Sequence, residues 1–321
     1  MSKGLVVGID LGATNLRAAL GNLEHGIVRV VKERTISSGS SEDLLNQLIE
    51  IVKRVASEKL SEIEAIGIGS IGPLDIKRGV LVKPANTRFR NVPIVERLSK
   101  EFKIPVYMLN DCTTAALGEK VFGAAKNFSN FVYVGIGTGI GGGVFVDGRL
   151  LLGKDGNAAE IGHMTIDVGD GLPCGCGGRG HWEAYCSGSG IPSFVKSWII
   201  SRKLEDLRNP LVDMAMRGEI TSRHLFDHAK AGDELALKIV EEIGRINAIG
   251  FANLINLFDP ELITIGGSIA LKNPDLILDP IKRHVGRYVI NRIPEIRLTP
   301  LGENIVLYGA IALALKRITL R

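Results

Sequence analysis

The sequence predicts an α/β fold made of two similar halves. An apolar strand, a glycine-rich turn and a second strand occur around Gly8–Thr14 and again around Gly135–Gly142. Each of these units opens a stretch in which strand and helix patterns alternate, which indicates a duplicated architecture. The chain of 321 residues is also longer than one core usually supports, and it suggests two domains of about 150 residues each.

The first half alternates apolar strands with amphipathic helices. The expected strands are Leu5–Ile9, Leu16–Leu20, Ile27–Arg34, Ala65–Gly69 and Ile104–Leu109. Ser40, with Asp43 three residues later, is a capping-box signal that begins a helix. Apolar residues follow it at helical spacing up to Val55. A second helix is expected at Thr113–Phe122.

The second half begins like the first and then becomes mostly helical. The expected strands are Phe131–Ile136, Val144–Val146 and Leu262–Ile265. The expected helices lie near Trp182–Ile200, Ser222–Lys230, Glu234–Phe258 and Ile305–Lys316. No long linker separates the halves, so any hinge is short and close to Asn110–Asp111.

Composition excludes several classes of protein. The hydrophobic share of 45% and the charged share of 23% are ordinary for a globular chain. The net charge of +4 is spread along the chain without a basic run that would bind nucleic acid. There is no signal-peptide pattern and no uninterrupted apolar stretch of about 18 residues. We therefore expect a cytoplasmic protein without a membrane span.

The first glycine turn, Asp10–Asn15, has the chemistry of a phosphate-binding loop. Gly12 lets backbone amides approach phosphate oxygens, while Thr14 and Asn15 add donors. Asp10 would repel bare phosphate, but it suits the water shell of a Mg²⁺ ion that carries phosphates. The alternative is an ordinary hairpin whose Asp accepts backbone hydrogen bonds.

Two further glycine turns end apolar strands. Gly137, Thr138 and Gly139 form one that is neither a P-loop nor a dinucleotide fingerprint, because no Gly-Lys-Ser/Thr follows and a strand continues. Gly266 and Gly267 form another, where a bare backbone lets an adenosine lie flat. Each turn alone is compatible with a plain hairpin, but the set of three favours a nucleotide held in a cleft.

A carboxylate stands where a catalytic base is needed. Asn110 and Asp111 follow the strand Ile104–Leu109 and begin a helix, at the edge of an α/β sheet where ligands bind. A sugar hydroxyl that attacks ATP needs a base to accept its proton. Asp111 suits that role, with Asn110 orienting the sugar. The alternative is that Asp111 only caps the helix.

The most specific stretch combines two cysteines with two histidines. His163, Cys174, Cys176 and His181 offer two thiolates and two imidazoles, which complete a tetrahedral zinc site with no open position. The alternatives are a free thiol pair, a redox pair or core histidines. Two carboxylates that can accept hydrogen bonds from sugar hydroxyls bracket the cluster. These are Glu160 and Glu183.

Together these residues resemble the ROK family of sugar kinases and sugar-responsive repressors, and within it the ATP-dependent glucokinases. The resemblance covers nearly the whole chain. It includes two phosphate motifs, an Asn-Asp pair, a Glu-x-Gly-His signature, a Cys-x-Cys-Gly-x-x-Gly-x-x-Glu signature and an adenosine-side Gly-Gly. The matching positions are Asp10–Asn15, Gly135–Gly142, Asn110–Asp111, Glu160–His163, Cys174–Glu183 and Gly266–Gly267.

The resemblance implies a fold and an activity. The fold would be two actin-like, ribonuclease H-like α/β domains with a cleft between them. Residues 1–110 plus 305–321 would form the small domain, and residues 111–304 the large domain with its zinc-binding loop. The activity would be transfer of the γ-phosphate of ATP, with Mg²⁺, to the 6-hydroxyl of glucose or a related hexose. The protein would be a homodimer or homotetramer that carries structural zinc.

The resemblance also implies a role for each site residue. Asp111 would be the catalytic base. Sugar contacts would come from Asn86, Asn110, Asp111, Glu160, His163 and Glu183, and nucleotide contacts from Asp10, Gly12, Thr14, Asn15, Gly137, Thr138, Gly139, Gly266 and Gly267. The family commonly has a third cysteine where this chain has His181. Because histidine is a competent zinc ligand, we expect a Cys₂His₂ site.

Several alternatives stay open at this point. The sugar could be an N-acetylmannosamine, an N-acetylglucosamine, fructose or allose, and some relatives use polyphosphate as donor. A sugar-binding protein without turnover is a rival of another class. Repressors of the family carry a winged helix-turn-helix before the first phosphate motif, for which the seven residues before Gly8 leave no room.

Overall fold

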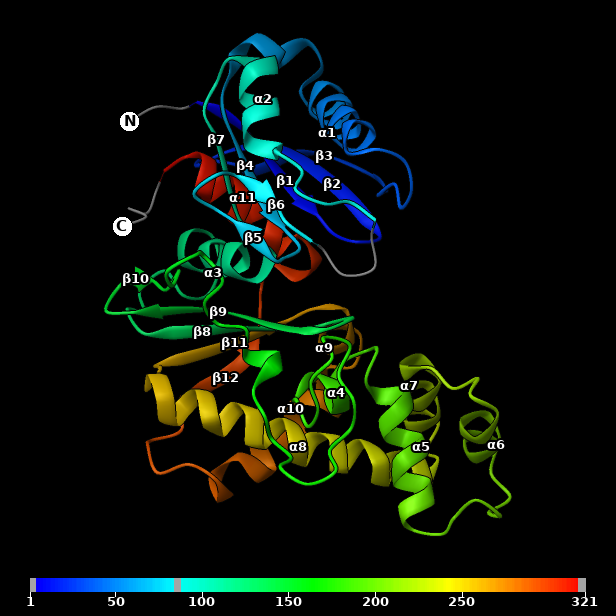
Figure 1. Ribbon diagram of the computed structural model, residues 1–321. Helices are drawn as coiled ribbons and strands as arrows, with labels where there is room; N and C mark the ends of the chain where they lie inside the picture. Colours follow the sequence, from blue (N-terminus) through cyan, green and yellow to red (C-terminus); the bar gives the residue numbers. More distant parts are fainter. Residues whose placement is uncertain (1–3, 84–87, 317–321) are drawn as a thin grey trace. The chain divides into compact units, whose positions relative to one another are not determined.

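The structure is a computed structural model that describes residues 4–83 and 88–316 (Figure 1). Its N-terminal sheet has the strand order β3-β2-β1-β4-β7. The strands are β1 (Leu5–Leu11), β2 (Asn15–Asn22), β3 (Gly26–Arg34), β4 (Ile63–Ser70) and β7 (Val106–Asn110). β1, β4 and β7 run parallel, so their carboxyl ends meet at one edge, while β2 and β3 add an antiparallel side.

Helices cover both faces of this sheet. They are α1 (Ser41–Ala56), α2 (Ile94–Phe102), α3 (Asp111–Val121) and α11 (Ile305–Ala314). Because strand side chains alternate, Val7 and Ile9 face a core shared with α1 and α2, whereas Val6 packs with Leu307 of α11. A Cβ on Gly8 would lie 2.9 Å from the Leu307 carbonyl oxygen, so glycine lets α11 lie close on the sheet.

The second sheet has the strand order β10-β9-β8-β11-β12. Its strands are β8 (Phe131–Ile136), β9 (Ile140–Val146), β10 (Arg149–Leu150), β11 (Leu262–Gly266) and β12 (Glu295–Leu298). The long helix α8 (Glu234–Phe258) contacts α4 (Glu183–Cys186), α7 (Ser222–Lys230) and α10 (Pro274–His284). The remaining elements are β5 (Leu74–Asp75), β6 (Val80–Leu81), α5 (Ile191–Ser201), α6 (Pro210–Arg217) and α9 (Ser268–Lys272).

The chain forms two compact units. One comprises Met1–Tyr133, Gly143–Ala159 and Thr299–Arg321, and the other comprises Val134–Gly142 and Glu160–Leu298. The second unit carries two of the three glycine turns and the Cys/His stretch. The predicted domain boundaries, 1–110 with 305–321 and 111–304, stay a prediction. In the described part of the chain, no helix is both long enough and apolar enough to cross a membrane.

The α/β class and the repeated strand–turn–strand unit are confirmed. Strand β8 and helices α7 and α8 have the predicted bounds, and the capping box of Ser40 and Asp43 forms as expected. The single helix predicted near Trp182–Ile200 is wrong, because Ser187 is extended and the chain forms α4 and α5 instead. Glycines and a proline at the start of α5 favour such a break. The sequence reasoning also missed α2 and β12.

Candidate active site and metal centre

The first glycine turn joins β1 to β2 and is braced by one neighbouring residue. Gly12 N–H donates to the Asn15 carbonyl at 3.0 Å. Thr35, which follows β3, donates its Oγ1 to the Gly12 carbonyl at 2.8 Å and its N–H to the Thr14 carbonyl at 3.0 Å. Within the described ranges, the N–H groups of Ala13 and Thr14 have no protein acceptor. Two consecutive amides of this kind are suited to bind an anion.

Asp10 at the end of β1 is paired with a residue that the sequence reasoning did not select. Arg17 lies directly opposite on β2 and donates both Nε, at 2.9 Å, and Nη2 to Asp10 Oδ2. Burial raises the pKa of the Asp10 carboxyl above its usual value, and the Arg17 guanidinium opposes that rise. The hairpin register contained the signal, because a short turn after Asp10 places Arg17 across from it.

Asn110 and Asp111 lie at the carboxyl edge of the same sheet. Asn110, not Asp111, caps α3: its Oδ1 accepts the N–H groups of Cys112 at 2.9 Å and Thr113 at 3.4 Å. Asp111 is the first helical residue, and its Oδ1 accepts the Cys112 N–H at 2.7 Å. Because β7 is two strands from β1, this pair lies about 10 Å from Asp10 along the sheet edge.

The second glycine turn joins β8 to β9 and lies beside the third. Gly137 N–H donates to the Gly139 carbonyl at 2.9 Å, and the described residues offer no acceptor to the N–H groups of Thr138 and Gly139. Gly267, at the end of β11, has a φ of +87°, and a Cβ there would lie 2.4 Å from the Ile136 carbonyl oxygen. Only glycine therefore lets the two turns lie so close together.

A cavity of about 260 Å³ opens at these two turns. Four hydroxyl side chains line it together with backbone from Gly137 and Gly188. The hydroxyls belong to Thr138, Ser189, Ser222 and Ser268. Short side chains and free amides leave room for a polar ligand and offer it hydrogen bonds. Of these serines, Ser189 and Ser222 were not anticipated from the sequence, because nothing local marks them.

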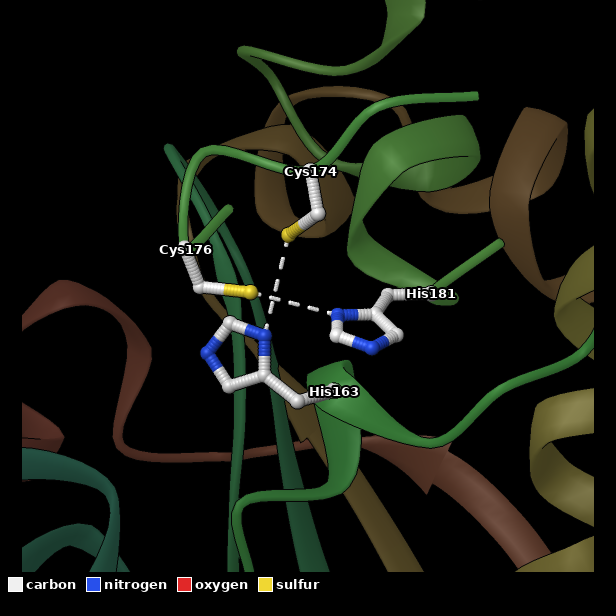
Figure 2. Close-up of side chains that lie close together, drawn as sticks. All are labelled: His163, Cys174, Cys176 and His181. Atoms are coloured by element: carbon white, nitrogen blue, oxygen red, sulfur yellow. Dashed lines mark hydrogen bonds between the residues drawn. The ribbon is translucent and has the colours of Figure 1, made fainter. Parts of the chain in front are cut away.

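The four predicted metal ligands come together in one cluster (Figure 2). Their ligand atoms all lie within 4.8 Å of one another. The Cys174 Sγ lies 3.7 Å from the His163 Nδ1, and the Cys176 Sγ lies 3.3 Å from the His181 Nδ1. Zinc bonds of about 2.3 Å to sulfur and 2.0–2.1 Å to nitrogen place the ligand atoms of a tetrahedral site roughly 3.3–3.8 Å apart. The donor set and its spacing therefore fit tetrahedral zinc.

The local fold explains how the four ligands meet. An isolated bridge pairs Thr165 with His181, which brings the two histidine segments side by side. Between them, Cys174 N–H donates to the Gly178 carbonyl at 2.8 Å and Gly177 N–H to the Cys174 carbonyl at 2.9 Å, closing a tight loop. His181 thus belongs to the cluster, as expected. The candidate zinc site has two cysteines and two histidines.

The two glutamates beside the cluster have different surroundings. Glu183 Oε2 accepts the Ile140 N–H at 2.9 Å, and its Oε1 lies 3.7 Å from the Cys174 Sγ. Glu160 is exposed, yet desolvation raises the pKa of its carboxyl, with His163 opposing and Glu183 reinforcing that rise. Glu183 therefore contacts both the metal cluster and the second glycine turn.

The predicted site residues fall into two groups. One unit gathers Asp10, Gly12, Thr14, Asn15, Asn110 and Asp111 at one sheet edge. The other gathers Gly137, Thr138, Gly139, Gly266, Gly267, Glu160, His163, Cys174, Cys176, His181 and Glu183. Asn86 lies outside the described residues.

Comparison with known proteins gives matches along almost the whole chain. The model of the ROK family matches residues 6–317. A glucokinase of Pyrobaculum calidifontis is 38% identical over 310 residues, which are 97% of this chain and 95% of that protein. A xylose repressor of Caldicellulosiruptor bescii is 30% identical over 321 residues, which are 97% of this chain and 78% of that protein.

The chain also matches a solved ROK family glucokinase from Streptomyces griseus, in complex with glucose and AMPPNP, with a TM-score of 0.80 at 31% identity. That match covers 98% of this chain and 100% of the other.

Proposed function

The chain belongs to the ROK family and has its actin-like α/β fold, and from this premise we propose that it is an ATP-dependent hexose kinase acting on the 6-hydroxyl of glucose. One observation carries the proposal. Asp111 lies on the same sheet edge as the first glycine turn, where two amides that have no acceptor among the described residues are suited to bind a phosphate. A repressor that only senses sugar has no need of this pairing of a carboxylate with a phosphate-binding turn.

The chain's own groups divide the reaction between them. Asp111 accepts the proton of the attacking hydroxyl, and the Nδ2 of Asn110 donates to the sugar, because its Oδ1 already caps α3. The amides of Thr14 and Thr138 neutralise charge that develops on the phosphate oxygens. Asp10 holds the Mg²⁺ of the nucleotide through water, and that ion supplies further neutralisation when it is bound.

The Cys/His cluster serves the sugar side of this proposal. Four protein ligands leave a zinc ion no open position, so the metal is structural. A zinc ion held by His163, Cys174, Cys176 and His181 would fix the orientation of the His163 ring, whose other nitrogen would then bind a sugar hydroxyl beside Glu160 and Glu183. The exposed Cys176 thiol suits a reducing, cytoplasmic setting.

A coupled assay tests the activity, by release of ADP where ATP is the donor and by formation of the sugar phosphate where polyphosphate is the donor. The purified protein is incubated with Mg²⁺, with ATP or polyphosphate, and with one sugar at a time from a panel of glucose, fructose, allose, N-acetylglucosamine and N-acetylmannosamine. We expect the highest kcat/KM with glucose and ATP. A higher value with another sugar would replace glucose in the proposal. Tight sugar binding without turnover would instead support a regulatory protein.

Asp111→Asn tests the assignment of the base. The substitution keeps the shape and the Oδ1 that accepts the Cys112 N–H, but it removes the basic oxygen. We expect kcat to fall by about 10²- to 10⁴-fold, the usual contribution of a general base. Binding of glucose and AMPPNP, measured by calorimetry, should stay within a few-fold of the parent protein. An undiminished kcat would refute the role of Asp111.

A further inference from the structure

The segment Ser187–Gly190 donates hydrogen bonds to two carbonyl groups of the second glycine turn. Gly188 N–H donates to the Gly137 carbonyl at 2.8 Å. Ser189 donates twice to the Thr138 carbonyl, from its N–H at 3.1 Å and from its Oγ at 2.8 Å. Because both turn carbonyls are bound by this segment, their position depends on where the segment lies.

The same segment is continuous with the metal cluster. Only Trp182 and α4 separate it from the ligand His181, whose carbonyl accepts the Ala184 N–H at 3.0 Å. Trp182 is fully buried, and its Nε1 donates to Asn247 Oδ1 of α8 at 2.8 Å. The short helix α4 is therefore preceded by the metal ligand His181 and followed by Ser189, the serine that binds the second glycine turn.

A second contact links the same two places. Glu183 is the first residue of α4, and its carboxylate accepts the Ile140 N–H with one oxygen while the other lies beside the Cys174 Sγ. A Cβ on Gly139 would lie 2.4 Å from Glu183 Oε2, so the carboxylate is packed directly against the turn. Displacing α4 would therefore disturb the turn at both of its ends.

We propose that Ser189 is a positioning residue that couples the Cys/His metal cluster to the glycine turn Gly137–Gly139. A bound metal fixes the position of His181 and therefore that of α4. Ser189, which follows α4, then fixes the position of the turn, whose amides bind nucleotide phosphate. A nucleotide that orders the turn then also holds the cluster, because coupling between two sites is reciprocal. The inference rests on the proposed function, since a nucleotide must use this turn.

Metal release measures the coupling without any catalytic readout. The Zn²⁺-loaded protein is mixed with the chromogenic chelator 4-(2-pyridylazo)resorcinol, with and without saturating AMPPNP and Mg²⁺, and the rate of zinc loss is recorded. We expect AMPPNP to slow zinc loss about 5-fold or more, the lower range of ordinary allosteric coupling. Ser189→Ala should lose most of this protection and bind AMPPNP about 2- to 10-fold more weakly, as expected for one lost hydrogen bond.

Two variants separate coupling from a general loss of structure. Ser189→Thr keeps a hydroxyl and should restore both the protection and the affinity. Ser201→Ala is a matched control on α5, where the Oγ donates to the Trp198 carbonyl at 2.9 Å and accepts from Nη1 of the neighbouring Arg202 at 3.2 Å, and it should behave like the parent protein. A purely structural effect of Ser189→Ala would raise the rate of zinc loss equally with and without AMPPNP, which would overturn the inference.

The outcomes also distinguish this inference from the proposed function. A parent protein that phosphorylates glucose and binds AMPPNP, but loses zinc at one rate in both conditions, would overturn the coupling alone. Full protection in Ser189→Ala would do the same. A parent protein that binds no AMPPNP would overturn the proposed function and this inference together, and one that takes up no zinc would overturn the inference only.

Discussion

The two phosphate-type turns of this molecule have the same backbone pattern but are held in different ways. In both, the first glycine N–H bonds a carbonyl two or three residues on, and the next two N–H groups have no acceptor among the described residues. The turn at Gly12 is braced by Thr35, the residue that follows strand β3. The turn at Gly137 is braced by Ser187–Gly190, about fifty positions further along the chain and directly after the metal ligands.

They also differ in charge. Asp10 and Arg17 form a partly buried ion pair at the first turn, whereas the contacts of the second turn are backbone groups, hydroxyls and the single carboxylate of Glu183. The first turn is therefore suited to the electrostatics of a metal-bound phosphate, and its brace is Thr35, the residue after the strand that pairs with β2. The second is suited to hydrogen bonding, and its geometry depends on a distant segment that a metal can order.

Of the substitutions considered, Cys174→Ser should produce the largest difference in behaviour between the two turns. It removes a thiolate ligand, so zinc content should fall from about one per chain to near zero, and loss of a structural metal is among the few changes that exceed about 4 kcal/mol. Hydrogen exchange should increase at residues 137–140 and 183–190, because these depend on the cluster. Exchange at residues 11–15 should stay unchanged.

A matched cysteine provides the control for this experiment. Cys186 is buried on α4 but lies outside the cluster, so Cys186→Ala should keep full zinc content. If Cys174→Ser increases exchange equally at both turns, the difference drawn between them is wrong. Mass spectrometry of the intact protein under native conditions measures the zinc.

The sequence predicted the locally determined parts of this picture well. The strand–glycine–strand units, the capping box at Ser40 and the four metal ligands were all recognised, since each depends on residues close together in the chain. The break at Ser187–Gly190 was missed, because apolar spacing on both sides favours one continuous helix. Ser189 was missed with it, since its partner Thr138 is far away in sequence.

Arg17→Met should have the next largest effect, and it acts at the first turn only. Burial raises the pKa of Asp10 and Arg17 lowers it, so removing the guanidinium moves the pKa further up and keeps Asp10 protonated to a higher pH. The acid limb of the kcat/KM profile for Mg-ATP should therefore shift to higher pH. At neutral pH we expect kcat/KM for Mg-ATP to fall about tenfold or more, since charge-assisted hydrogen bonds contribute about 1.5–3 kcal/mol.

Arg17→Lys keeps the positive charge and is the control for this shift. Its acid limb should lie close to that of the parent protein, although its single ammonium cannot reproduce both guanidinium contacts. Zinc release should be unaffected in both variants, because Arg17 belongs to one unit and the metal cluster to the other. An acid limb that does not move in Arg17→Met would show that Asp10 does not control the profile.

Asp111 illustrates a limit of sequence reasoning within one short motif. Both Asn and Asp are good helix caps, so the sequence could not decide which of residues 110 and 111 caps α3. The structure assigns the cap to Asn110, which places Asp111 one position further along, in the first helical turn. The roles of two adjacent polar residues thus depended on where the strand ended, and strand ends are set by pairing with β4.

Thr35→Val should have the smallest effect and tests the brace of the first turn directly. The substitution keeps the shape of a nearly buried side chain but removes the hydrogen bond from Oγ1 to the Gly12 carbonyl. We expect a loss of about 1 kcal/mol in the free energy of unfolding and a rise of a few-fold in the KM for Mg-ATP. Thr35→Ser should retain most of both values. The decisive comparison is with Ser189→Ala: Thr35→Val should leave the protection of zinc by AMPPNP intact, because Thr35 belongs to the unit that does not hold the metal cluster. Loss of that protection in Thr35→Val would mean that the two turns respond as one, and the distinction between a locally braced and a metal-braced turn would fail.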